Sequence, residues 1–233
     1  MLDTPAKLHD WKIEPREYAR QEERRGRRHA FESLDPTRTA LVVIDMVPFF
    51  TGNAYCRGII PNINRLATKL RAAGGTVAWV LPSDEQTHPA LEREFYGEAV
   101  AELFRNSGGA GPLPARLAAD LTQHAEDLFV EKQGPSAFFP GMSRLHDELC
   151  ARQIDTALIT GTVTNVCCES SARDARTRGY RVIMVADANA ARRDADHNAT
   201  LHTIYRTFGD VRPTDEVLAL IGAGTVASVH STG

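Results

Sequence analysis

A cysteine lies at the junction between an apolar, strand-like segment and a polar, helix-compatible one. Residues 156–160 (TALIT) are rich in apolar and β-branched side chains, whereas residues 169–178 are polar, so Cys167 falls in the first turn of a helix. Free backbone N–H groups and the positive end of the helix dipole stabilise a thiolate there, and the thiolate is the attacking form of cysteine. Cys167 is therefore a candidate nucleophile, with a small core residue as the ordinary alternative.

Two further residues stand at the ends of strand-like runs. Asp45 closes the continuous apolar run 39–45 (TALVVID), and Lys132 follows the run 128–131. In open α/β sheets, ligands bind beyond the carboxyl ends of the strands, and nucleophilic catalysis needs a thiol, a proton acceptor and a positive charge together. Taken alone, the acid could cap a helix and the lysine could face solvent. Together they predict that Asp45, Lys132 and Cys167 meet in one crevice.

Such a meeting requires strands that lie side by side. Apolar runs alternate with helical stretches along the chain, which is typical of a three-layer, doubly wound α/β fold with a mainly parallel sheet and helices on both faces. The expected strands are residues 39–45, 76–81, 128–131, 156–160 and 182–186, and the helical stretches include residues 60–73 and 142–153.

The chain is expected to form one principal domain. We divide it into a polar N-terminal arm at residues 1–34, a single α/β domain at residues 35–225 and a C-terminal tail at residues 226–233. The least regular part is residues 82–126, which is a candidate lid or subunit contact, or a mere connection. A short helix is expected to begin at Thr214.

Composition argues against several classes of protein. The 233 residues are 42% hydrophobic with a formal net charge of −3, and no apolar run approaches the roughly 20 residues of a membrane span. Neither a nucleic-acid partner nor a membrane partner is expected. The arm lacks the apolar segment of a signal peptide, so we expect a cytoplasmic protein. The four cysteines show neither zinc-site nor disulfide spacing.

Three motifs resemble the isochorismatase-like cysteine hydrolases. The similarity runs from about Thr39 to Arg212, and the third motif is the most specific. The motifs are VVIDM at residues 42–46, Glu131-Lys132 with Ser136-Ala137-Phe138 behind it, and TNVCCESSARDA at residues 164–175.

The resemblance implies a catalytic triad of Asp45, Lys132 and Cys167. It further implies an oxyanion hole made by the backbone N–H groups of Val163 and Cys167, and a cis peptide between Thr162 and Val163. In the mechanism we expect, Asp45 accepts the thiol proton, the thiolate forms an acyl thioester with the substrate, and water then releases the acid.

The adjacent cysteines are expected to have different roles. The family pattern places the nucleophile directly after Thr-Asn-Val, which selects Cys167. Cys168, Ala172 and Ala175 fall at i, i+4 and i+7, a stripe of small residues that suits packing against the sheet. We therefore expect Cys168 to be a core residue.

The expected reaction is hydrolysis of a C–N bond without a cofactor or a metal. Nicotinamidases carry an Asp-x-His metal site after the second strand, where this chain reads PSDEQTH at residues 82–88. Candidate substrates are amides, ureido compounds and cyclic amides such as the streptothricin lactam. Aromatic residues that could line an apolar pocket, or simply belong to the core, are Phe49, Phe50, Tyr55 and Phe138.

Other functions compete with this interpretation. One is vinyl ether hydrolysis of the isochorismatase type, which needs no thiol nucleophile. Another is a non-catalytic domain of the same fold that binds a small molecule. An aspartyl-phosphate enzyme lacks the extra acids that a Mg²⁺ site beside Asp45 would require. The family is commonly oligomeric, so we expect a homo-oligomer, either dimer or tetramer.

Overall fold

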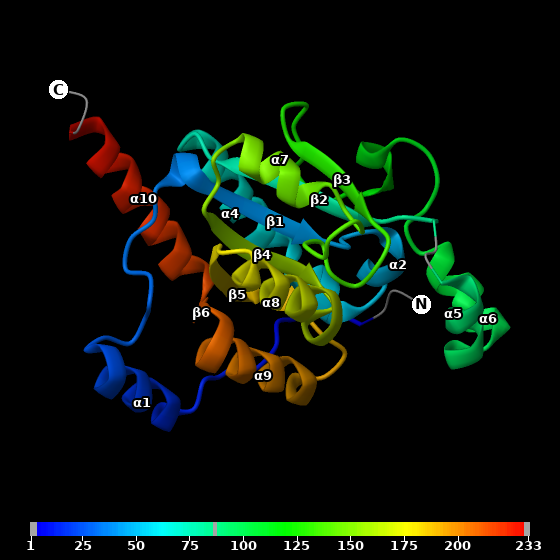
Figure 1. Cartoon of the computed structure of the whole chain (residues 1–233), viewed down its shortest axis with the longest axis horizontal. Coiled ribbons are helices and arrows are strands. Elements are labelled where there is room, and N and C mark those ends of the chain that lie inside the picture. Colours follow the sequence, from blue (N-terminus) through cyan, green and yellow to red (C-terminus); the bar gives the residue numbers. More distant parts are fainter. Residues whose placement is uncertain (1–3, 86–87, 231–233) are drawn as a thin grey trace.

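The protein is built around a parallel β-sheet. The structure, a computed structural model, describes residues 4–85 and 88–230. Within these residues the sheet has six strands in the order β3-β2-β1-β4-β5-β6, and every neighbouring pair is parallel (Figure 1). This confirms the doubly wound α/β fold. The strands are β1 (Thr39–Ile44), β2 (Thr76–Pro82), β3 (Leu128–Lys132), β4 (Thr156–Thr162), β5 (Arg181–Ala190) and β6 (Asp210–Arg212).

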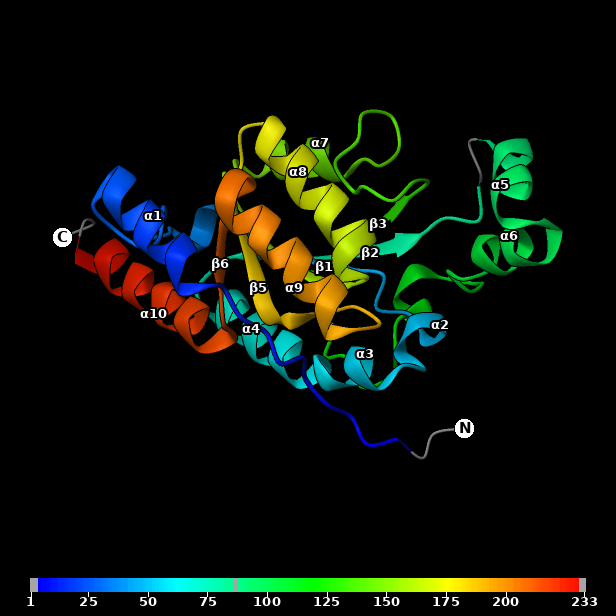
Figure 2. The same ribbon diagram turned by 90° about the horizontal axis from the view of Figure 1, so that it is seen from below.

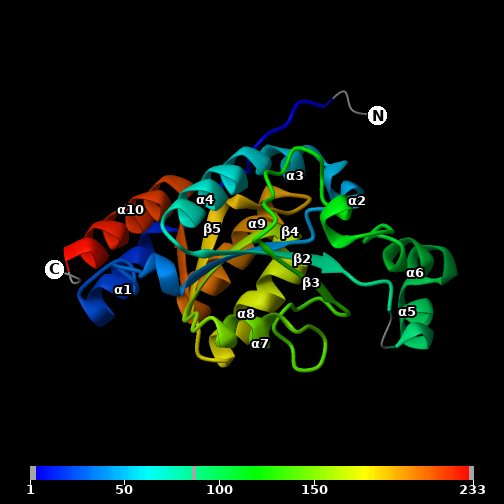
Figure 3. The same ribbon diagram turned by 90° about the horizontal axis from the view of Figure 1, so that it is seen from above.

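Helices cover both faces of the sheet (Figures 2 and 3). On one face lie α3 (Ala54–Gly58), α4 (Ile60–Ala72) and α10 (Thr214–His230). On the other lie α7 (Leu145–Ala151), α8 (Glu169–Thr177) and α9 (Asp194–Thr203). The remaining helical elements are α1 (Pro15–Arg25), α2 (Pro48–Thr51), α5 (Pro89–Tyr96), α6 (Glu98–Arg105), the 3₁₀ turns Pro36–Arg38 and Leu113–Arg116, and the π turns Thr164–Cys168 and Ile204–Phe208.

Strand β1 shows why the apolar runs are continuous. Ala40, Val42 and Ile44 enter the core on the α8 side, whereas Leu41 and Val43 enter the core on the α4 side. Because successive strand residues point to opposite faces, a strand covered by helices on both sides needs an apolar residue at every position. Full burial of each larger side chain contributes on the order of 1.5–3 kcal/mol.

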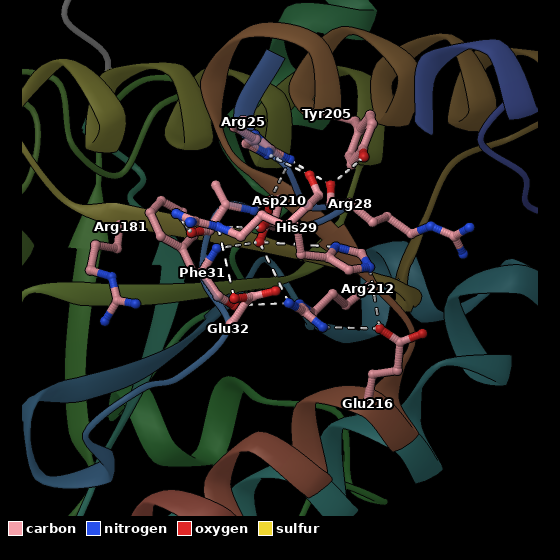
Figure 4. Close-up of polar contacts among 12 residues, drawn as sticks. Arg25, Arg28, His29, Phe31, Glu32, Arg181, Tyr205, Asp210, Arg212 and Glu216 are labelled. Atoms are coloured by element: carbon pink, nitrogen blue, oxygen red, sulfur yellow. Dashed lines mark hydrogen bonds and ion pairs between the residues drawn. The ribbon is translucent and has the colours of Figure 1, made fainter. Parts of the chain in front are cut away.

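The N-terminal arm is packed against the domain. Ile13 belongs to the core, and Glu17 and Gln21 of α1 are buried. Further along, the buried carboxylate of Asp210 in β6 accepts hydrogen bonds from the backbone N–H groups of Ala30 at 2.7 Å and Phe31 at 2.9 Å (Figure 4). The polar arm is therefore held to the body of the protein by both apolar and polar contacts.

Two other segments differ from the sequence-based expectation. Helix α10 runs to His230, so the expected tail begins as helix; residues 231–233 lie outside the described residues, as do residues 1–3 of the arm. Within the 82–126 segment, the sequence pattern of residues 88–104 favours a helix, and the structure has two helices there, α5 and α6, separated at Gly97, where φ is 80°. These two helices project from the body of the protein in all three views (Figures 1–3). No helix among the described residues is both long and apolar enough to cross a membrane.

Candidate active site

The structure brings Asp45, Lys132 and Cys167 together at the carboxyl edge of the sheet. Asp45 follows β1, Lys132 is the last residue of β3, and Cys167 lies in the π turn after β4. Lys132 Nζ is 2.9 Å from Asp45 Oδ2 and 3.5 Å from Cys167 Sγ. Strands β1 and β3 are not neighbours, because β2 lies between them. The long lysine side chain spans this gap, and its Nζ also donates to the Gly134 carbonyl at 3.1 Å.

The backbone of Asp45 is held in an unusual conformation. Its φ is 53°, in the left-handed region that Asp tolerates better than most residues with a side chain. Its N–H donates to the Val80 carbonyl of β2 at 2.8 Å, and its own carbonyl accepts from Thr162 Oγ1 of β4 at 2.9 Å. Contacts with both flanking strands therefore fix the position of the Asp45 backbone, and with it the position of the Asp45 carboxylate at the edge of the sheet.

The neighbouring strands β1 and β4 approach each other closely just before the cysteine turn. Gly161 has a φ of 111°, and a Cβ built there would lie 2.1 Å from the Ile44 carbonyl oxygen. The next peptide bond but one, between Thr162 and Val163, is cis, as the family resemblance implies. The Val163 carbonyl then accepts hydrogen bonds from Val166 N–H at 3.0 Å and Cys168 N–H at 3.3 Å. This geometry turns the chain sharply and presents Cys167 to the crevice.

The two cysteines occupy different environments. Cys168 is fully buried in the core with Ala172 and Ala175, where the helical stripe places it. Cys167 is partly accessible and lines a cleft that Asp45 and Lys132 also line. The packing therefore separates a core thiol from one that a ligand can reach.

Burial controls the protonation of the three groups. It raises the pKa of Asp45 above 3.8, against the opposing effect of the Lys132 charge. Burial and the Asp45 carboxylate together raise the pKa of Cys167 to about 12, although Lys132 opposes them. Burial alone would lower the pKa of Lys132, but the charges of Asp45 and Cys167 raise it. Desolvation therefore outweighs the helix end at Cys167, so its thiol needs the proton acceptor that the expected mechanism assigns to Asp45.

The three side chains open into a cleft of about 1080 Å³. Phe49 and Phe50 line it, as expected from the sequence. Tyr55 and Phe138 lie elsewhere, which corrects their assignment to substrate binding. Tyr55 stacks on His9, with ring centroids 3.9 Å apart, and Phe138 is buried in the core against Tyr180, at 5.3 Å between ring centroids.

Two basic cleft residues, Arg105 and Arg192, were missed by the sequence analysis. Arg192 lies two residues after the end of β5, so the rule that drew attention to Asp45 and Lys132 could have found it. Arg105 reaches the cleft from α6, which no local pattern indicates. Glu85 also lines the cleft, where its Oε2 accepts a hydrogen bond from Gln133 Nε2 at 2.7 Å. Across the described ranges, no group of three or more His, Cys, Asp or Glu side chains is placed to hold a metal ion.

A doubly wound sheet with an acid, a lysine and a thiol at its carboxyl edge defines the structural class of this protein. The isochorismatase domain family matches residues 39–216, and the chain belongs to that family. The matched residues contain the whole sheet, since β1 begins at Thr39 and β6 ends at Arg212.

Characterised and uncharacterised relatives share this domain. The chain is 31% identical to the uncharacterised isochorismatase family protein YwoC of Bacillus subtilis, over 80% of this chain and 95% of that protein. It is 39% identical to nicotinamidase 3 of Arabidopsis thaliana, over 82% of this chain and 93% of that protein. It is 28% identical to the ureidoacrylate amidohydrolase RutB of Rhizobium rhizogenes, over 81% and 85% respectively.

Solved structures agree with these relatives. A cysteine hydrolase from Pseudomonas syringae superposes with a TM-score of 0.73 at 30% identity, covering 84% of this chain and 98% of that chain. The N-carbamoylsarcosine amidase from Thermoplasma acidophilum superposes with a TM-score of 0.61 at 26% identity, covering 76% and 97% respectively.

Proposed function

We propose that this protein hydrolyses a non-peptide C–N bond through a thioester on Cys167. The observation that carries the proposal is the position of Lys132 Nζ, within 3.5 Å of Cys167 Sγ and 2.9 Å of Asp45 Oδ2. Relatives named as ureidoacrylate amidohydrolase and nicotinamidase, and a structural neighbour named N-carbamoylsarcosine amidase, support hydrolysis of an amide-type bond.

The first half of the reaction transfers one proton and forms one bond. Asp45, whose pKa is raised by burial, takes the proton of the Cys167 thiol. The thiolate sulfur attacks the acyl carbon, and the tetrahedral intermediate collapses as Asp45 returns the proton to the departing nitrogen. The amine or ammonia leaves, and the acyl group remains on sulfur as a thioester.

Water completes the reaction. The Asp45 carboxylate accepts a proton from the water, the hydroxide attacks the thioester carbon, and the thiolate leaves and recovers the proton. The products are a carboxylic or carbamic acid and the free enzyme. Throughout both halves, Lys132 keeps a positive charge beside whichever of Asp45 and Cys167 is negative, since both raise its pKa.

The developing oxyanion needs hydrogen-bond donors that do not move. We assign this role to the backbone N–H groups of Val163, which follows β4, and of Cys167, which lies in the π turn Thr164–Cys168. Such a donor in an enzyme contributes on the order of 3 kcal/mol to transition-state stabilisation.

The cleft favours a small substrate with both apolar and polar parts. Phe49 and Phe50 supply an apolar wall, and Arg192 and Arg105 supply positive charge. Glu85 lies at the cleft, but its hydrogen bond with Gln133 reduces its value as an anchor for a cationic substrate. Because Glu92 and Asp196 also line the cleft, its charge does not rank simple amides, ureido acids and cationic lactams such as streptothricin against one another.

The test is to trap the thioester and to identify the product. The wild-type protein is incubated with a panel of amides, ureido acids and lactams, released ammonia or amine is measured, and acid-quenched samples are analysed by mass spectrometry. An acyl adduct on the peptide that contains Cys167 is expected for active substrates. Turnover with no adduct, together with full activity of Cys167→Ser, would exclude the thioester route. Ligand binding without turnover in either protein would favour a binding domain.

A further inference from the structure

The first described residues form a strap that crosses the domain beside the cleft. Residues 4–13, which we call the N-terminal strap, run past α3 and α9 (Figures 1 and 2). The Lys7 N–H donates to the Ala54 carbonyl at 3.2 Å, and the Lys12 N–H donates to Asn198 Oδ1 at 2.8 Å. The strap precedes the region that matches the family domain, which begins at residue 39.

His9 is the most buried polar group of the strap. Its side chain is 1% exposed, and its Nδ1 lies 2.6 Å from Asp194 Oδ1. Its Nε2 accepts a hydrogen bond from the Ala191 N–H at 2.9 Å. Because an amide N–H can only donate, the proton of the neutral ring sits on Nδ1 and points to the carboxylate of Asp194. Both ring nitrogens are therefore used.

The His9 ring also joins two other aromatic rings. It stacks on Tyr55 of α3 at 3.9 Å and on His197 of α9 at 4.3 Å, with interplanar angles of 10° and 14°. His197 in turn places its Nδ1 2.9 Å from Thr164 Oγ1. Thr164 is the first residue of the π turn that carries Cys167. A continuous series of buried contacts thus links the strap to the proposed nucleophile.

His9 also contacts residues that lie at or next to the cleft. Ala191, whose N–H donates to His9 Nε2, lines the cleft with Arg192. Tyr55 is outside the cleft lining, but Asn53 and Cys56, which are close to it in the sequence, belong to that lining. A strap that served only to tie down the chain terminus would need none of these positions. Here a single ring contacts α3, the loop after β5, and α9.

We propose that His9 is a positioning residue, which holds the turn of Cys167 in its reactive geometry through His197 and Thr164. This inference rests on the proposed role of Cys167 as nucleophile. It predicts that displacing the strap slows the chemical step, because a small misplacement of a reacting group has a large effect on rate. Substrate affinity should change little, since His9 does not line the cleft.

The protonation of the stacked rings supplies an independent readout. Burial lowers the pKa of His9 below 6.5 although Asp194 raises it, and Lys7 lowers it further. Burial and His9 lower the pKa of His197 to about 3. The pKa of His9 is therefore lower when the strap is docked than when the strap is released. Because the released strap binds more protons, docking weakens as pH falls below about 6.5. Tyr55 is the remaining titratable group that faces His9.

The experiment compares wild type, His9→Ala, Thr164→Val, the double variant and the control Lys12→Ala. The side chain of Lys12 is exposed and only its backbone holds the strap, so this control should behave as wild type. Three quantities are measured at pH 7.5 and 5.5. They are kcat and KM for the substrate found above, and the rate at which iodoacetamide alkylates Cys167, read by mass spectrometry.

His9→Ala is expected to lower kcat and the Cys167 alkylation rate by about tenfold to a hundredfold at the higher pH, with KM changed less than about threefold. The double variant should be no slower than the slower single variant, because both changes interrupt one series of contacts. The alkylation rate of Cys167 in wild type should be lower at pH 5.5 than at pH 7.5. The same change in pH should lower the alkylation rate of His9→Ala by a smaller factor.

Three results would overturn the inference. In the first, folded His9→Ala has the same kcat and alkylation rate as wild type. In the second, the effects of His9→Ala and Thr164→Val add in the double variant. In the third, His9→Ala changes KM alone. If His9→Ala does not fold, Thr164→Val decides: an unchanged alkylation rate there overturns the inference. Full activity of Cys167→Ala would instead refute the proposed function, while the alkylation of Cys167 would still report whether the strap positions its turn.

Discussion

Lys132 and Asp45 form an ion pair with 2.9 Å between Nζ and Oδ2, and their side chains are only 4% and 1% exposed. Two charges removed from water at this depth depend on each other, because neither can recover its hydration while the fold is intact. Loss of either charge alone should therefore destabilise the fold, and the pair is also part of the candidate site.

The first prediction concerns the loss of one partner. Lys132→Met leaves the Asp45 carboxylate buried without its cation and should lower the free energy of unfolding by about 3–5 kcal/mol. Urea denaturation followed by circular dichroism measures this change. The matched control is the double variant Asp45→Asn/Lys132→Met, which removes both charges and should recover part of the stability without any activity. A double variant less stable than Lys132→Met alone would contradict the interpretation.

The second prediction separates the adjacent thiols. Cys167→Ala should lower kcat by at least about a thousandfold, because the nucleophile of an acyl-transfer reaction is lost. Cys168→Ala removes a core sulfur and should cost about 1 kcal/mol of stability while activity remains. Product release and thermal unfolding are measured on both proteins. The reverse outcome, with Cys168→Ala inactive and Cys167→Ala active, would exchange their roles.

The third prediction is the pH dependence of kcat/KM. Asp45 must be ionised to take the thiol proton, so the rate should fall as pH drops through the pKa of Asp45, which burial places above 3.8. The Cys167 pKa of about 12 keeps the thiol protonated through the neutral range, so no further rise is expected up to about pH 9. The acidic limb belongs to the coupled set rather than to one residue.

A tenfold rise in kcat/KM for each unit of pH up to about pH 9 would show instead that simple ionisation of the thiol limits the rate. The initial rates should be collected with substrate well below KM and at constant ionic strength, so that they report the free enzyme.

The fourth prediction concerns the expected homo-oligomer. Phe95 of α5 and Leu103 of α6 are 77% and 52% exposed on the helices that project from the body. Apolar side chains gathered on such a projection favour association, and we expect a second copy of the chain to cover them. Phe95→Glu should lower the mass measured by light scattering. The control Glu94→Gln, at the neighbouring exposed position, should leave it unchanged. A monomeric wild-type protein would contradict this prediction.

The sequence was informative where the signal is local. Four of the strands carry continuous apolar runs, since they are covered on both faces, and the edge strand β3 carries the shorter run LFV before Glu131 and Lys132. The three-residue strand β6 has no room for a pattern of its own and was not predicted. Helix α10 was expected to be short, although its helix-compatible residues continue to His230.

Other features depend on contacts between distant segments. Tyr55 and Phe138 flank the site in sequence, but His9 and Tyr180 determine where their rings lie. The neutral state of the Cys167 thiol follows from its burial beside Asp45, which the helix-start pattern does not contain. Stacking of His9 on His197 joins residues far apart in the chain, so no local spacing could have indicated it.

The last prediction tests the close approach of β1 and β4 that positions the turn of Cys167. Gly161→Ala places a Cβ 2.1 Å from the Ile44 carbonyl oxygen, at a residue whose φ is 111°. Gly179 also has a positive φ, 94°, but a Cβ there would have no heavy atom within 4 Å, so Gly179→Ala is the matched control. The control should lose about 1–2 kcal/mol from the left-handed conformation alone. Gly161→Ala should lose clearly more and should also slow turnover, because the backbone clash displaces Thr162 and Val163. Equal losses of stability in the two variants, measured by urea denaturation, would show that the close approach of the two strands does not constrain the site.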